Sequence, residues 1–439
     1  MPHAARSPRF GAIRVLGALA AITLIAACRP DRGCPGSLDV SGPYADLVRE
    51  IAPRLEQSTG LCFTAPPKVE EKSPEEVRQF VERQLRSERA RREITSQGAV
   101  YKRLGLVPDT LDLYALLERL YAEQIVGYYD PKTKALYLVK GARRDLLKTT
   151  LSHELVHALQ DQHVNVDSIQ SLTGDADRLA AAQAVIEGQA VYEQFAYQFG
   201  GNFATQVQGS WQTIKESVRD NQQAQPIFAA APLAIRESLI FPYLGGAEFV
   251  RKFVARRPAK TLLSQIPVST KQLLNDDAFF GTAPDAPTPV TITVTGGTTR
   301  YDNGFGEFES RLIFFQHLRD EAVAARTAHG IDGDRYALVE TPKGDAIAWA
   351  SVWDTPVMAG NFALGLADVV RKRYKNAVRN PEGAREGDVR RFDIAARERD
   401  GARTVTIATR EIDGRPVIIF TDAPAGVTLT SAVTLGASR

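Results

Sequence analysis

The stretch LSHELVHALQDQH at 151–163 holds three of the six histidines of this 439-residue chain. Within it, His153, Glu154 and His157 form an HExxH pattern. On a helix, side chains four positions apart project from one face, so both imidazoles can reach one metal ion. Glu154 is offset from that pair and can take a proton from a metal-bound water. We therefore expect one catalytic Zn²⁺ on a helix, with Glu154 as the catalytic base.

A catalytic zinc takes three protein ligands and keeps one position open, and the sequence offers two candidates for the third ligand. His163 would complete the pattern HExxHxxGxxH, but Gln160 stands where that pattern has glycine, and glutamine disfavours a positive-φ turn. The metzincin pattern also needs a methionine turn, and Met358 is the only methionine besides the first residue. Glu187 lies in the apolar stretch AVIEGQAV, where an unpaired carboxylate is costly to bury. We favour Glu187 and keep His163 as the alternative.

Other stretches accompany the HExxH pattern, namely GYYDPKTKALYL, VIEGQA, PVSTKQLL, GDRY and VWDT. In this order and spacing the chain resembles bacterial gluzincin-like zinc metallopeptidase lipoproteins, which carry HExxHxxQDQH and a later EGxA. The resemblance runs from about residue 100 to 355. It implies zinc bound by His153, His157 and Glu187, with Glu154 as the base. It implies a reaction class and no particular substrate.

The chain departs from these relatives at two positions. Asn275 stands where they tend to have histidine, and Val191 stands where thermolysin-like enzymes have an aspartate four residues after the glutamate ligand. The groups that orient the metal ligands are therefore not identified from the sequence. A tetrahedral intermediate also needs an oxyanion donor, for which Tyr243 is the first candidate and His317 and His329 are further ones.

A strand pair and two helices should position these residues. Two apolar-aromatic runs at 125–129 and 135–139 flank the turn-forming cluster DPKT, which predicts a β-hairpin. The HExxH helix follows directly, and residues 175–199 predict a second long helix. In that layout an edge strand can hold an extended peptide beside the catalytic helix.

The HExxH helix should also contribute to the core. Leu151, Leu155, Ala158 and Leu159 form an apolar stripe along it. We expect this stripe to pack inwards and the histidines to lie on the other face, towards a cleft.

The N-terminus has the features of a processing segment. Three arginines precede the short apolar run 15–27, which is too short to span a bilayer comfortably. The run ends in LIAAC, which resembles a bacterial lipobox with Cys28 as the lipidated residue. Because residue 29 is not aspartate, we expect anchoring to the outer membrane of the cell envelope, facing the periplasm.

The remaining two cysteines, Cys34 and Cys62, should form a disulfide, because the expected compartment is oxidising. The formal net charge is +2, with acidic and basic residues interspersed. Such a balance favours no nucleic-acid partner.

The Pro-rich stretch APDAPTPV at 283–290 predicts a domain boundary. Beyond it the runs are β-type, interrupted by helices near 306–328 and 356–378. We predict an α+β chain with four segments: a lipoprotein signal peptide (1–27), a tether and N-terminal segment (28–75), a mostly helical zincin-like metallopeptidase domain with a small edge β-hairpin (76–286), and a smaller α+β C-terminal domain (287–439).

The predicted function is hydrolysis of peptide bonds by a membrane-anchored zinc metallopeptidase, with a peptide or protein as substrate. One alternative is a non-catalytic envelope lipoprotein with a structural metal site. Others are a metzincin-like variant that uses His163, and an amidase acting on cell-wall peptides. An intact Glu154 favours an enzyme, because structural zinc has no use for a base and prefers four protein ligands. The sequence leaves the oligomeric state open.

Overall fold

The computed structural model describes residue 34 and residues 38–437, apart from 142–143, 201–211, 213–214, 217, 221–223, 376, 381 and 398–400. The expected signal peptide (1–27) and Cys28 lie outside the described residues. Contacts unite Cys34–Arg439 into one unit. Within the described part, no helix combines the length and the apolarity that crossing a membrane requires.

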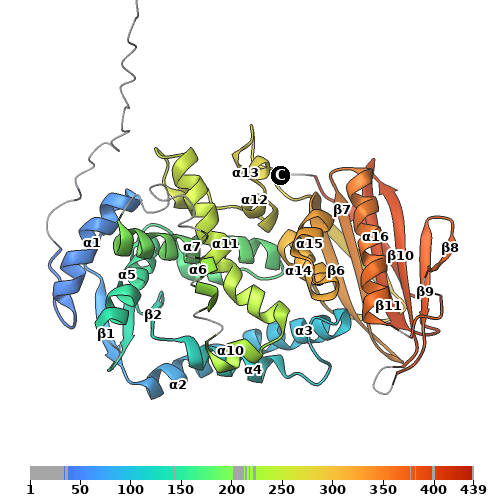
Figure 1. The fold of residues 1–439 in the computed structure, drawn as a ribbon, viewed down its shortest axis with the longest axis horizontal. Helices are drawn as coiled ribbons and strands as arrows, with labels where there is room; N and C mark the ends of the chain where they lie inside the picture. The colour runs from blue at the N-terminus through green and yellow to red at the C-terminus, as the bar shows by residue number, and fades with distance from the viewer. Residues whose placement is uncertain are drawn as a thin grey trace, which may run out of the picture. The chain divides into compact units, whose positions relative to one another are not determined.

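The chain is a mixed α+β protein whose first part is mostly helical (Figure 1). Its elements are α1 (Ala45–Thr59), β1 (Lys68–Lys72), α2 (Pro74–Leu85), α3 (Glu88–Leu104), α4 (Leu113–Gln124), β2 (Gly127–Asp130), β3 (Ala135–Val139), α5 (Arg144–Asp161), α6 (Val166–Gln170), α7 (Ala176–Phe199), α10 (Pro226–Ala230), α11 (Leu233–Arg256), the 3₁₀ turn η1 (Leu262–Ser264), α12 (Thr270–Leu274) and α13 (Asp276–Phe280).

The predicted hairpin is present as β2 and β3, but it belongs to a three-stranded sheet in the order β1-β3-β2. β1 pairs with β3 in parallel and lies in the segment 28–75, for which the sequence predicted a tether and N-terminal segment and no strand. β1 has the sequence KVEEK, in which only Val69 is buried, so the sequence shows no strand-like apolar pattern. Pairing with the buried strand β3 supplies the stability that the sequence of β1 lacks. β2 remains at the edge of the sheet.

The helix α5 carries the HExxH pattern and is buried on more than one side. The predicted stripe, which includes Leu151 and Leu155, is fully buried. Val156 and Gln160, outside that stripe, are at most 1% exposed as well. The expectation of one packing face and one cleft face was therefore too simple. α5 is a central helix, packed against α1, α7, β2 and β3.

Helices α7 and α11 cross at backbone contact distance. A Cβ placed on Gly246 would lie 1.8 Å from the Ala184 carbonyl oxygen, and one on Gly188 would lie 2.1 Å from the Gly246 carbonyl carbon. Real Cβ atoms do not approach that closely, so the crossing requires glycine on both helices. Gly188 follows Glu187 directly, so this crossing also determines where Glu187 lies.

The second part of the chain is built on strands. Its elements are β4 (Val290–Thr295), β5 (Thr298–Asn303), α14 (Gly306–Leu318), α15 (Glu321–Ala328), β6 (Ile331–Thr341), β7 (Gly344–Trp353), α16 (Pro356–Arg373), β8 (Ala384–Glu386), β9 (Val389–Ile394), β10 (Arg403–Ile412), β11 (Arg415–Pro424) and β12 (Thr430–Leu435). Seven strands form one sheet in the order β5-β6-β7-β11-β10-β9-β8, and β12 pairs with β4.

Alternating side chains divide this sheet into two buried faces. Leu338 and Trp349 pack in the core that includes α14, α15 and α16, and α16 runs along this face in Figure 1. Their neighbours Val339 and Ala348 pack on the other side, with Val294 of β4. The sheet is therefore covered on one face by helices and on the other by the β4–β12 ribbon.

Two details differ from the expected connections. Residues 283–290 are held in place by contacts, since Thr288 is buried and its backbone N–H donates to the Asp332 carbonyl at 2.5 Å. The expected helix at 306–328 is two helices, because Arg319 adopts a left-handed φ of 58° and Asp320 caps the second helix.

We predict that Gly246→Ala destabilises the fold by about 1–3 kcal/mol or more, because the added methyl group must push α7 and α11 apart. The free energy of unfolding, measured by urea titration, checks this. Gly360→Ala in α16 is the control, since a Cβ there meets no atom within 4 Å. Equal stability of the two variants would contradict the close crossing.

Candidate metal centre

The structure brings together His153, His157 and Glu187 from two helices. The Nε2 atoms of the two histidines are 3.2 Å apart. Each lies close to the Glu187 Oε2 atom, at 3.4 Å from His153 and 3.5 Å from His157. Two imidazole nitrogens and one carboxylate oxygen thus face one point, which is the donor set of a catalytic zinc site.

The charges in this cluster favour a bound cation. Burial lowers the pKa of His157, but the neighbouring Glu187 carboxylate outweighs burial and raises that pKa to about 9. Burial acts to raise the pKa of Glu187, and the two histidines together hold it well below its usual range. The carboxylate therefore keeps its negative charge at neutral pH and draws positive charge into the space between the three side chains.

Gln160 orients one of the ligands. Its side-chain oxygen lies 2.9 Å from His157 Nδ1. Its amide nitrogen donates to the Ile186 carbonyl and to the Gln189 side chain, both at 3.0 Å. Because the amide nitrogen is committed to these acceptors, the oxygen faces His157, which must donate from Nδ1. In the neutral ring that tautomer places the lone pair on Nε2, where a metal ion that displaces the proton can bind.

Gln160 was not identified from the sequence as the residue that orients His157, because an orienting carboxylate was sought at position 191. Val191, where an aspartate was sought, is a buried core residue. Gln160 was noted only as a residue that hinders a turn. The available signal was its position: it lies three residues after His157 on the same helix, within reach of that ring.

Glu154 lies beside the ligands and not among them. It is 7% exposed, and burial raises the pKa of its carboxyl group, opposed by the positive charge that the two histidines carry when protonated. It also has a hydrogen bond with the backbone of Tyr129 in β2. A carboxyl group with a raised pKa, next to a metal-type donor set, has the character of a general base.

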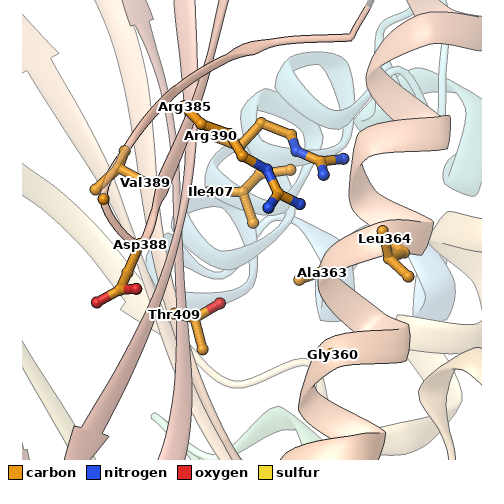
Figure 2. A pocket seen from close by; sticks show the side chains of 10 residues that line it. Gly360, Ala363, Leu364, Arg385, Asp388, Val389, Arg390, Ile407 and Thr409 are labelled. Carbon is orange, nitrogen blue, oxygen red and sulfur yellow. The ribbon is translucent and has the colours of Figure 1, made fainter.

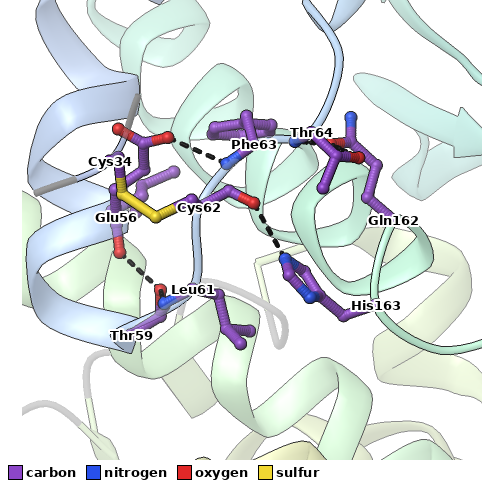
Figure 3. Close-up of a disulfide and its surroundings, with 10 residues drawn as sticks. Cys34, Glu56, Thr59, Leu61, Cys62, Phe63, Thr64, Gln162 and His163 are labelled. Carbon is purple, nitrogen blue, oxygen red and sulfur yellow. Dashed lines mark hydrogen bonds between the residues drawn. A yellow bond between two sulfur atoms is a disulfide. The ribbon is translucent and has the colours of Figure 1, made fainter. Parts of the chain in front are cut away.

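His163 does not join the site. Its Nε2 atom donates to the Cys62 carbonyl at 2.8 Å, as Figure 3 shows, and the residue is exposed. α5 continues helically through Gln160 to Asp161, so the chain makes no sharp turn that would return His163 to the metal ligands. The structure therefore does not bring His163 together with His153 and His157, as the metzincin-like alternative requires.

The residues after the HExxH pattern attach α5 to neighbouring segments. Asp161 accepts from Tyr129 Oη at 2.7 Å and pairs with Lys134 at 2.6 Å. The Gln162 side chain accepts from the backbone N–H of Thr64 at 2.6 Å (Figure 3). Together with His163, these contacts join the C-terminal end of α5 to strand β2 and to the segment that follows α1.

Cys34 and Cys62 form a disulfide with a Cα–Cα distance of 5.4 Å. Because Cys62 also accepts from His163, the disulfide connects residue 34 to the end of the HExxH helix (Figure 3). Glu56 lies near both sulfurs, but sulfurs bonded to each other are not thiolate ligands, so this group is not a metal site.

Of the three candidate oxyanion donors, the structure places only Tyr243 at the centre. Its ring lies 6.3 Å from the His153 ring, and the negative charge of Glu187, followed by burial, raises its pKa well above the usual value. Its hydroxyl group therefore stays protonated and can donate a hydrogen bond. His317 contacts the Leu104 carbonyl and His329 contacts Asn275, both away from the HExxH pattern.

Three aspartates, Asp285, Asp332 and Asp354, also lie close enough together to hold a metal ion, but the side chain of Lys271 already supplies positive charge there. Lys271 Nζ lies 2.6 Å from Asp285 Oδ2 and 2.8 Å from Asp354 Oδ1. Arg415 pairs with Asp332. The lysine comes from PVSTKQLL, and Asp354 comes from VWDT, so these two motifs form an internal ion-pair network.

A family model described as "Domain of unknown function (DUF8575)" matches residues 293–423. No curated protein and no solved structure matches the chain. The matched residues lie in the strand-rich part and include none of the metal-centre residues, so the match assigns no chemistry to the centre.

We predict that Gln160→Ala weakens zinc binding by about 10–100-fold, because His157 loses the partner that sets its tautomer. Glu187→Ala should lose stoichiometric zinc altogether, whereas His163→Ala should keep it. Zinc content after dialysis against a competing chelator measures all three.

Gln162→Ala is the matched control for Gln160→Ala. It removes a glutamine from the same end of α5, but one that contacts Thr64 and no metal ligand. Its zinc affinity should stay near that of the unmodified chain. A similar loss of affinity in both variants would mean that Gln160 acts on the helix and not on His157.

Proposed function

We propose that this protein is a zinc-dependent metallopeptidase of the gluzincin type. One observation carries the proposal: the ligand atoms of His153, His157 and Glu187 face a common point, with the buried carboxyl group of Glu154 beside them. A structural zinc site would use four protein ligands and would gain nothing from such a carboxyl group.

The ligand side chains are not sealed from solvent. Their exposed fractions are 15% for His153, 11% for His157 and 24% for Glu187. When bound there, zinc supplies Lewis acidity towards water and towards the carbonyl oxygen of a peptide. The residues of the chain then have to handle the protons and hold the substrate.

Glu154 has the proton-transfer role in this proposal. Its carboxylate takes a proton from the attacking water, and the resulting acid gives that proton to the departing amine nitrogen. Its raised pKa suits both steps, because the group must accept a proton and release it within one cycle. Tyr243 is placed to donate its hydroxyl hydrogen to the oxygen that becomes negative.

Strand β2 gives the substrate a place to align. It is the outer strand of the order β1-β3-β2, and its Tyr129 is bonded to Glu154 through the backbone and to Asp161 through the side chain. An extended peptide can add to such an edge by main-chain hydrogen bonds. We therefore expect a polypeptide substrate bound in extended form.

We also propose that the mature chain is attached to the cell envelope through a lipid on Cys28, with the outer membrane as its destination. Cys28 and Cys34 are six positions apart, so the connecting chain spans at most about 20 Å. Cys34 is joined to Cys62, which contacts His163 at the end of α5. Attachment would therefore hold the HExxH helix near the membrane surface, where its substrates would be found.

We predict that Glu154→Gln abolishes peptide hydrolysis while zinc stays bound, because the amide cannot take a proton but leaves the three ligands in place. Cleavage of a mixed peptide library, followed by mass spectrometry, measures activity, and zinc content is read in parallel. Glu193→Gln on α7 is a control that also changes a buried glutamate. A zinc-loaded chain with no Glu154-dependent cleavage of any peptide would refute the enzymatic proposal.

We predict that Cys28→Ser releases the protein from the membrane fraction, because the serine hydroxyl cannot form the thioether to lipid. Fractionation of bacterial cells that express each form, with detection by antibody, checks this. Cys34→Ser should break the disulfide but leave the protein in the membrane fraction. Equal membrane retention of Cys28→Ser and the unmodified chain would contradict lipid attachment at Cys28.

A further inference from the structure

A groove lies between helix α16 and strands β8, β9 and β10, far along the sequence from the HExxH pattern (Figure 2). It encloses about 420 Å³. Its lining includes Gly360, Ala363 and Leu364 from the helix and Ile407, Arg390 and Arg385 from the strands. The two guanidinium groups point into the space in front of α16.

The strand register explains why one wall changes from apolar to cationic. Ile407 of β10 is opposite Arg390 of β9, and Arg390 is opposite Arg385 of β8. Directly opposed residues project from the same face of a sheet. Ile407 is 3% exposed under α16, whereas the next two positions extend beyond the helix and carry arginine. The three opposed residues, Ile407, Arg390 and Arg385, therefore lead from the buried core to an exposed, positively charged end of the groove.

The two arginines have no ion pair with any carboxylate among the described side chains. Arg371 on α16, by contrast, pairs with Asp368 and Glu382. Burial and then the positive charges of Arg385 and Arg371 lower the pKa of Arg390. The carboxylates of Glu382 and Asp368 act on that pKa in the opposite direction, but both pair with Arg371. Two like charges side by side, with no ion pair of their own, favour an anion between them.

The helix side of the groove is apolar and uncovered. Leu364, which lines the groove, is 53% exposed. Val357, seven positions earlier on the same face of α16, lies next to the groove residues in sequence and is 72% exposed. Gly360 lies between them, and a Cβ there would meet no atom within 4 Å. This open space beside two large exposed apolar side chains can accept an apolar side chain of a ligand.

We propose that this groove binds the C-terminus of a peptide, with the terminal carboxylate on Arg385 and Arg390 and an apolar last side chain against Leu364 and Gly360. Guanidinium groups match carboxylates in a bidentate geometry. β8 pairs only with β9 among the described strands, so its outer edge can pair with the peptide backbone. The site shares no residue with the metal centre and does not depend on the proposed hydrolysis.

The chemistry of the groove favours a chain end over other anions. The cationic groups lie at one end and the apolar wall at the other, which suits a carboxylate attached directly to a residue with an apolar side chain. Asp388 also lines the groove, but its carboxylate lies apart from the two guanidinium groups (Figure 2). Inorganic phosphate would use only the arginines. An acidic side chain within a longer chain would leave its own residue with no apolar side chain for the apolar wall, and it would need room for the chain on both sides.

The test compares two labelled octapeptides that end in Val-Ala-Leu, one with a free carboxylate and one with a C-terminal amide. Fluorescence anisotropy measures their binding to the purified full chain, with a chelator present so that hydrolysis does not interfere. We expect the acid to bind at least about tenfold more tightly than the amide. Arg390→Gln should lose about that factor, while Arg326→Gln on α15 should bind like the unmodified chain.

Gly360→Leu tests the apolar half of the groove without removing a charge. The new side chain enters open space and replaces a helical glycine, so the fold should be at least as stable. We expect it to abolish peptide binding. Equal binding of acid and amide, or unchanged affinity in Gly360→Leu, would overturn the proposal. So would full competition by millimolar phosphate, or binding of phosphatidylglycerol vesicles that the peptide does not displace.

Discussion

The negative charge of Glu187 is the constraint on which the candidate centre depends. Two histidines one helical turn apart could serve many purposes, but a carboxylate held 3.4 Å and 3.5 Å from their Nε2 atoms needs positive charge beside it, from a protonated imidazole or a bound metal ion. The carboxylate reaches that point because α7 and α11 approach to backbone contact beside it, at Gly188 and Gly246. The close crossing of α7 and α11 at Gly188 and Gly246 thus determines where the Glu187 carboxylate lies relative to the two histidines, although neither glycine contributes a functional side chain.

The C-terminal end of α5 gives this geometry its rigidity. Gln160 sets the tautomer of His157, Asp161 fixes strand β2, and Gln162 and His163 bind the segment next to the disulfide. Four consecutive residues, 160–163, therefore attach the end of α5 to helix α7, to strand β2 and to the segment that contains Cys62 and Thr64. Because the same helix carries two of the candidate ligands and the proposed base, any displacement of its end would move His153, His157 and Glu154 together. A catalytic arrangement tolerates little of such movement.

The sequence was informative where local spacing decides the outcome and failed where tertiary contacts decide it. HExxH spacing places two imidazoles together on any helix, and the cost of burying Glu187 pointed to the third member of the cluster. Local sequence also decides the start of α2, where Ser73 and Glu76 form a capping box. Strand β1 was missed, because its charged residues form a strand only by pairing with β3. Gln160 was misread, because its role depends on acceptors that α7 provides.

The motifs outside the metal centre connect the helical part to the sheet. Asp334 of GDRY accepts from the N-terminal N–H groups of α14 and from Trp349, and Lys271 of PVSTKQLL pairs with Asp354 of VWDT. Asp177 at the start of α7 accepts from the Thr270 backbone at 3.0 Å, and burial raises its pKa to about 8. Asp354, within the segment 293–423, thus has its cationic partner, Lys271, outside that segment. Lys271 is buried, and a buried charge that loses its partner is strongly destabilising. The strand-rich segment therefore stabilises α12, and Asp177 joins α12 to α7, the helix that carries Glu187.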